Sequence, residues 1–248
     1  MLQALDAALH VTTQEKATPF GAACERLRAT FGDSREVPEP HARLNAVVWA
    51  LQDAPTVGMA IAAEAAACMG RADPAPRGTS LEDDALRSFL RSRDCFWRTR
   101  FALESTVRYL HSSADLLAQF INLVLALEID EATKGMTAAI CRKLAERDDC
   151  AAVITAFDRL RRSAEFEYIA DLSNRSKHRR VTPGSIKASL NDGGGIDVSQ
   201  HLGPFEFDMR QHPEIDPDQL AERISVLQDL TAAVLNGVAD ALTQQRPG

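Results

Sequence analysis

The sequence predicts a mainly α-helical fold, a helical bundle with one small β-hairpin. Apolar residues recur at helical spacing through most of the 248 residues, glycine and proline are sparse at 13 and 11 residues, and strand-like alternation occurs in one place only. The chain is 45% hydrophobic and 25% charged, which fits a folded domain and excludes a disordered or collagen-like chain. Its formal net charge of −7 excludes a bulk nucleic-acid binder.

The first third of the chain, 1–78, is rich in alanine and is expected to form an N-terminal helical extension. Proline and glycine interrupt it at 35–40 and 72–78, which leaves three expected helices, near 17–31, 40–52 and 56–70. The remainder, 79–248, is expected to form the main bundle, with the hairpin inserted in it.

The clearest periodicity predicts one long helix from Ser80 to about Leu127. Its second half carries apolar residues at alternating steps of four and three, which places them in one core-facing stripe: Leu103, Val107, Leu110, Ala114, Leu117, Ile121 and Val124. A polar row with the same spacing follows beside it: Glu104, Arg108, His111 and Asp115. An ion-pair ladder is the commoner outcome of such a row, and an acid or histidine that completes a site is the alternative. The paired Glu-x-x-His spacing of di-iron bundles does not occur, so no metal is expected.

Shorter elements are expected in the second half of the chain. The patterns predict helices over 133–146 and about 151–177, a β-hairpin over 185–201, and a last helix that begins after the cap Asp216-Pro217. His201 and His212 fall in sequence that resembles loops and lack ligand spacing, so no site is predicted there.

Chemistry-bearing residues are densest where the helix 151–177 ends. The segment 158–180 holds seven basic and four acidic residues, although the whole chain is acidic. Leu172, Arg175 and His178 are three residues apart, so a continuing helix places the arginine and the histidine in line with the buried face. Cations that cap a helix C-terminus are the structural alternative. The functional reading is a phosphate site for RNA or a nucleotide, built from Asn174, Arg175, Lys177, His178, Arg179 and Arg180.

Helical spacing also provides partners for this histidine. Asp171 precedes Arg175 by four residues and Asn174 precedes His178 by four, so these side chains can hold the imidazole in one orientation. We expect this helix end to line a polar cleft together with Glu104, Arg108 and His111 of the long helix.

Cysteine usage and hydropathy predict a cytoplasmic location. The five cysteines, Cys24, Cys68, Cys95, Cys141 and Cys150, are odd in number and scattered, so free buried thiols in a reducing compartment are expected. The N-terminus lacks the basic residue that precedes the hydrophobic run of a secretory signal, so no such signal is expected. The most apolar stretch, 116–129, is too short and too polar to cross a membrane, so no span is expected.

Two segments together resemble bacterial members of the HEPN superfamily: 103–119 in the long helix and 168–179 at the basic helix end. The resemblance covers about 80–245 and implies a bundle of four to five helices with an Arg-x(4–6)-His motif at the end of a helix. His178 matches the motif histidine, and Asn174 matches the polar residue before it. Arg175 departs from the motif, because it lies only three residues before His178.

The resemblance implies a metal-independent ribonuclease of a toxin–antitoxin or anti-phage system, with no cofactor. His178 would then act as general base on an RNA 2′-hydroxyl, and Arg175 and Lys177 would stabilise the charged transition state. The implied partners are RNA or a nucleotide, an antitoxin or other protein, and a second copy in a homodimer. The alternative is a scaffold that binds a nucleotide, RNA or a protein without cleavage.

Overall fold

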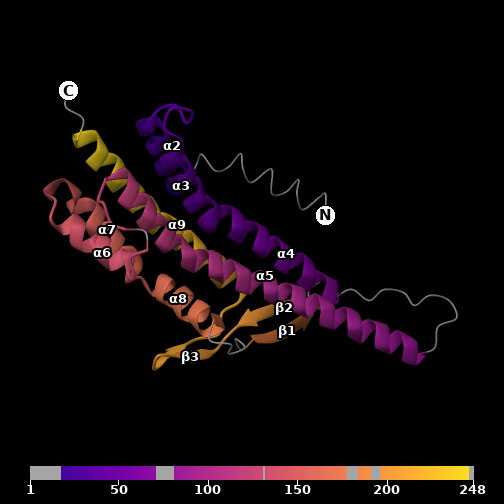
Figure 1. Cartoon of the computed structure of the whole chain (residues 1–248). Coiled ribbons are helices and arrows are strands. Elements are labelled where there is room, and N and C mark those ends of the chain that lie inside the picture. Colours follow the sequence, from indigo (N-terminus) through magenta and orange to yellow (C-terminus); the bar gives the residue numbers. More distant parts are fainter. Residues whose placement is uncertain (1–17, 71–80, 131, 178–183, 191–195, 246–248) are drawn as a thin grey trace. The chain divides into compact units, whose positions relative to one another are not determined.

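The computed structural model describes residues 18–70, 81–130, 132–177, 184–190 and 196–245 (Figure 1). This part of the chain is mainly α-helical, as predicted, with two small antiparallel sheets of two strands each. The described residues form two compact units, the first made of 18–55, 108–170 and 222–245, the second of 56–107 and 171–221. The predicted boundary at residue 78 lies within 71–80, outside the described residues.

The first predicted helix is confirmed as α2, Pro19–Phe31. Thr18 caps it, because its hydroxyl accepts a hydrogen bond from the Gly21 N–H at 3.0 Å, and proline takes the first helical position. The second predicted helix is confirmed as α3, Pro38–Val48.

The predicted break before the third helix is wrong. α3 continues through a π-helical turn, η2 (Trp49–Asp53), directly into α4 (Ala54–Gly70). Pro55 has no N–H to donate to the Leu51 carbonyl four residues earlier. The side chain of Gln228 supplies the missing donor, with its Nε2 at 2.9 Å from that carbonyl oxygen. The wide turn and this donor explain how the helix tolerates a proline.

This continuous helix contains a candidate membrane span. The stretch Pro38–Met69 is long and apolar enough to cross a membrane by length and composition, with a mean hydropathy of 1.3 in its most apolar window. The sequence predicted no span, with 116–129 as the most apolar stretch, whereas the structure offers Pro38–Met69 as a candidate. Core helices of soluble proteins meet the same criterion, and 39% of the window is buried inside the protein.

The long helix is confirmed as α5, Leu81–Val124, and Ser80 lies outside the described residues. The predicted stripe is buried in six of its seven positions, and Val124 at the C-terminal end is half-buried. In the turn that follows, the Asn122 amide both donates to the Ile129 carbonyl at 2.8 Å and accepts from its N–H at 3.1 Å.

The helix predicted over 133–146 is confirmed as α6, Met136–Ala145. The single helix predicted over 151–177 is wrong, because the chain forms α7 (Ala151–Arg161) and α8 (Ala164–Lys177). Ser163 causes the new start: its Oγ accepts a hydrogen bond from the Phe166 N–H at 3.1 Å, as an N-cap does.

The last helix is confirmed as α9, Pro217–Gln244. Asp216 Oδ1 accepts from the Gln219 N–H at 2.8 Å, and Gln219 Oε1 accepts from the Asp216 N–H at 3.0 Å. These reciprocal bonds form a capping box. Further along, α9 lies close to α7, since a Cβ on Gly237 would lie 3.2 Å from the Val153 nitrogen.

The predicted β-hairpin is confirmed. β1 (Gly184–Leu190) pairs antiparallel with β2 (Ile196–Leu202), from Gly184 opposite Leu202 to Leu190 opposite Ile196. A second ladder, β3 (Phe205–Phe207) with β4 (Arg210–His212), was not predicted. His201 lies in β2 and His212 in β4, rather than in the loops expected for them. β4 has three residues, which is too short to show alternation in the sequence.

The cysteine prediction is wrong for one pair. Cys68 of α4 and Cys95 of α5 form a disulfide, with Cα atoms 6.2 Å apart and a separation of 27 positions in sequence. No local motif signals a pair at this separation. Cys24, Cys141 and Cys150 are free, as expected, and burial raises the pKa of the Cys150 thiol to about 11.

Candidate functional site

The end of α8 carries the predicted residues Asn174, Arg175 and Lys177, while His178, Arg179 and Arg180 lie outside the described residues. Arg175 is half-buried and contacts the second ladder: its Nη1 donates to the Glu206 carbonyl at 2.6 Å, and its guanidinium lies 6.0 Å from the centre of the Phe205 ring. Its Nε is buried and has no hydrogen-bond partner in the described part of the chain. Arg175 was predicted to lie in line with the buried face of the helix, and in the structure its side chain is half-buried.

Asp171 binds a histidine of the second ladder, His212, and the expected His178 lies outside the described residues. Arg210 binds its carboxylate with two hydrogen bonds, at 2.8 and 2.7 Å, and His212 Nε2 lies 2.8 Å from Oδ2. The Asp171 side chain is 4% exposed, and the Phe205 ring stacks on the imidazole of His212 at 4.5 Å. These bonds fasten β4 to α8.

The carboxylate of Asp171 is stabilised in its charged form. Burial by itself would raise the pKa of Asp171, but the hydrogen bonds from Arg210 and His212 outweigh burial and hold the pKa below its usual value. The cluster is therefore a charged anchor for the second ladder. Sequence reasoning missed it because the three residues are 39 and 41 positions apart.

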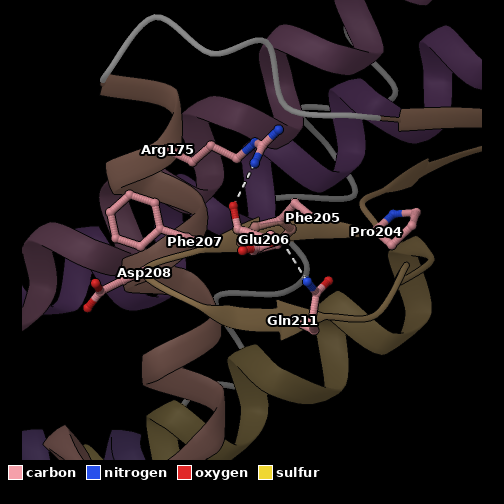
Figure 2. Close-up of a pocket in the computed structure, with 7 residues that line it drawn as sticks. All are labelled: Arg175, Pro204, Phe205, Glu206, Phe207, Asp208 and Gln211. Carbon is pink, nitrogen blue, oxygen red and sulfur yellow. Dashed lines mark hydrogen bonds between the residues drawn. The ribbon is translucent and has the colours of Figure 1, made fainter.

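Arg175 also lines an open pocket of about 790 Å³ (Figure 2). The other lining residues come from the second ladder and its turn: Pro204, Phe205, Glu206, Phe207, Asp208 and Gln211. Gln211 Nε2 donates to the Glu206 carboxylate at 2.7 Å. Because Glu206 and Asp208 are acidic and exposed, the pocket is poorly suited to a free phosphate.

In the polar row on α5, Glu104 forms an ion pair, but with a residue outside the row. Glu104 pairs with Arg100, one turn earlier, at 3.0 Å, and both side chains are largely buried. The His111 ring stacks on Phe166 with centroids 6.2 Å apart, and Arg108 is exposed. Glu104 belongs to one compact unit and His111 to the other, so the shared cleft with α8 stays a prediction.

The N-terminal half of α5 carries an exposed surface that sequence reasoning missed. Trp97 and Phe101 are 43% and 60% exposed and stack on each other, with ring centroids 5.8 Å apart and planes at 27°. Four exposed arginines lie on the same segment, and we call the whole set the α5 arginine–aromatic face: Arg87, Arg91, Arg93, Trp97, Arg98 and Phe101.

Helical spacing explains this face. Leu90, Trp97 and Phe101 follow at steps of seven and four, so they form one exposed stripe, and the arginines flank it on both sides. Asp94 is the single acidic residue between 87 and 101, and it pairs with Arg98 at 2.9 Å. The signal was present in the sequence, since 87–101 holds five arginines against one aspartate.

The fold and these sites define the protein as a mainly α-helical protein that carries a small β region and a cationic aromatic surface. No family model, curated protein or solved structure matches the chain. Among the described residues, no group of three or more histidine, cysteine, aspartate or glutamate side chains could hold a metal ion.

Proposed function

We propose that this protein binds single-stranded RNA through the α5 arginine–aromatic face. The observation that carries the proposal is the exposed stack of Trp97 on Phe101 between exposed arginines. Unpaired bases stack on aromatic rings, and guanidinium groups bind the phosphates between them. Duplex RNA hides its base faces, so the exposed rings favour a single strand.

The charge distribution supports this choice. The chain as a whole is acidic, at −7, so a local excess of arginine is not a by-product of its composition. Large exposed aromatic side chains beside each other are uncommon on a folded surface unless they contact a partner. An apolar partner would suit the rings alone, whereas a polyanion with stacking groups suits both the rings and the arginines.

The resemblance of 103–119 and 168–179 to the HEPN superfamily points to RNA from other parts of the sequence. On this basis we place the protein in an HEPN-like branch, as a homodimer with a neutralising protein partner in a toxin–antitoxin or anti-phage system. Binding without cleavage is favoured, because Arg175 donates to the Glu206 carbonyl instead of standing open for a phosphate. Cleavage by His178, with Arg175 and Lys177 as the cations, is the catalytic alternative.

Replacing both Arg87 and Arg93 by alanine is expected to weaken RNA binding several-fold. Each lost phosphate contact should also reduce the slope of log affinity against log salt by roughly 0.7, since fewer counterions are released. The measurement is fluorescence anisotropy of a labelled single-stranded RNA, with chelator present, at several salt concentrations.

The matched control is the pair Arg142→Ala and Arg159→Ala, which removes two exposed arginines from α6 and α7. This control should keep both the affinity and the salt slope of the unmodified protein. An equal loss in both double variants, or no binding by the unmodified protein, would contradict the proposal. The same samples on a gel report cleavage, which His178→Ala should abolish if the catalytic alternative holds.

A further inference from the structure

A row of contacting side chains, one hydrogen bond and one ion-pair contact, crosses one face of the hairpin β1–β2 and ends on Glu214. Ser199 Oγ lies 2.9 Å from His201 Nε2, and His201 Nδ1 lies 3.3 Å from Glu214 Oε1. Ser199 and His201 are two residues apart in β2, so they share one face of the strand. A hydroxyl, an imidazole and a carboxylate linked in this order form the arrangement that activates a serine nucleophile.

The backbone fixes Glu214 beside β2. Leu202 and Ile215 exchange two hydrogen bonds, at 2.9 and 2.8 Å, which bring the segment after β4 against the end of β2. From the neighbouring strand, Ser185 Oγ donates to Glu214 Oε2 at 2.7 Å, and Lys187 Nζ pairs with Oε1. The carboxylate is therefore held by three side chains of the hairpin.

The charge of Glu214 sets the tautomer of the histidine. The Glu214 carboxylate accepts hydrogen bonds from Lys187 and Ser185, which hold the pKa of Glu214 below its usual range. An ionised carboxylate at Nδ1 favours the tautomer that carries its proton there. Nε2 is then free to accept the hydrogen bond of the Ser199 hydroxyl, which is the role of a general base.

The exposure of Ser199 and His201 fits a reactive site. His201 is 9% exposed, so its imidazole is held in place, while Ser199 is only half-buried and its hydroxyl can be approached. Lys187 lies directly opposite Ser199 in the strand register and adds positive charge to this face. Ser185 and Lys187 already fasten Glu214 to the hairpin, so the Ser199–His201 bond is not needed for that anchor.

We propose that Ser199 is an activated nucleophile and that this hairpin face is a catalytic site for the hydrolysis of a carboxylic ester. Ser199 Oγ forms a bond to the ester carbonyl carbon while its proton passes to His201 Nε2. The bond from that carbon to the leaving oxygen then breaks, and the leaving alcohol takes the proton from Nε2. Water, deprotonated by the same nitrogen, attacks the acyl-serine, releases the carboxylic acid and restores the hydroxyl.

Positive charge would assist the addition step. The carbonyl oxygen becomes negative as the tetrahedral intermediate forms, and Lys187, opposite Ser199 in the strand register and paired with Glu214, contributes positive charge on the same face of the hairpin. Glu214 stabilises the imidazolium that forms at the same time. The site is independent of the α5 arginine–aromatic face, so its test does not depend on RNA binding.

The test is covalent labelling of the full-length protein by a fluorophosphonate probe, with the labelled peptide identified by mass spectrometry. We expect the probe on Ser199 of the unmodified chain and no labelling of that peptide in Ser199→Ala. In His201→Gln the labelling rate should fall by at least about tenfold. The control Ser225→Ala removes an exposed serine of α9, and the probe should label Ser199 of this variant at the unmodified rate.

Failure has a clear signature. No probe on Ser199 of the unmodified chain, or an unchanged labelling rate in a folded His201→Gln variant, would overturn the proposal. Circular dichroism reports whether each variant is folded. Because the peptide is first mapped on the unmodified chain, the result does not require any variant to fold.

Discussion

Replacing Asp171 by alanine is expected to lower the free energy of unfolding by about 3 kcal/mol, because it removes the carboxylate that anchors β4 to α8. The Asp171 side chain is 4% exposed and binds both Arg210 and His212. Arg210 is 43% exposed and can turn to water, but His212 is 8% exposed and would lose the carboxylate partner of its Nε2. Urea unfolding followed by circular dichroism measures the difference.

The control for this substitution is Asp229→Ala. Asp229 is exposed on α9, so its loss should change stability by no more than about 0.5 kcal/mol. Equal effects in the two variants would mean that the Asp171 cluster does not anchor the second ladder.

The stabilising effect of Asp171 should also disappear in acid. Hydrogen bonds from Arg210 and His212 outweigh burial and hold the folded-state pKa of Asp171 below the unfolded value, which is about 3.9. A depressed folded pKa contributes stability that is present above the unfolded pKa and is lost as the pH falls through the folded pKa. Unfolding curves should therefore show a large difference between the unmodified protein and Asp171→Ala at pH 6, and a smaller one near pH 3. A constant difference across this range would contradict the ionic anchor.

Local signals predicted much of the helical framework. The steps of four and three from Leu103 to Ile121 identify the buried face of α5, and Asp216 with Pro217 marks the start of α9. These features depend on spacing within a few turns, which a sequence displays directly. The start of α8 was equally local, since Ser163 is a common cap residue, but the surrounding helical pattern obscured it.

Features that depend on distant residues could not be read in this way. A proline such as Pro55 usually breaks a helix, and the π-helical turn together with the Gln228 side chain, 177 residues from Leu51 in sequence, makes the continuous helix tolerable. The disulfide between Cys68 and Cys95 depends on how α4 meets α5.

The candidate sites divide along the same line. Arg175 was predicted from the sequence, and it does line the pocket of Figure 2, but the partners of Asp171 come from a ladder too short to predict. The α5 arginine–aromatic face is different, because its residues are contiguous and could have been found. In an acidic chain the basic end of α8 was the local excess of positive charge that the prediction used. The segment 87–101 has a stronger excess, with five arginines against one aspartate.

Replacing both Trp97 and Phe101 by alanine should weaken binding of single-stranded RNA by about 2–4 kcal/mol, or roughly 30- to 1,000-fold, because each stacked base contributes about 1–3 kcal/mol. Both rings are exposed, so the fold should remain intact. The salt slope should stay near that of the unmodified protein, since stacking releases no counterions. Anisotropy titrations at several salt concentrations measure both quantities.

Trp49→Ala is the matched control for these rings, because Trp49 is 46% exposed and lies outside the arginine-rich segment. It should bind RNA like the unmodified protein. The arginine variants and the aromatic variants are thus expected to separate: the first lower the salt slope, and the second lower the affinity at an unchanged slope. If the aromatic double variant kept full affinity while the arginine variant lost it, the face would bind polyanions by charge alone, and the assignment to single-stranded RNA would be wrong.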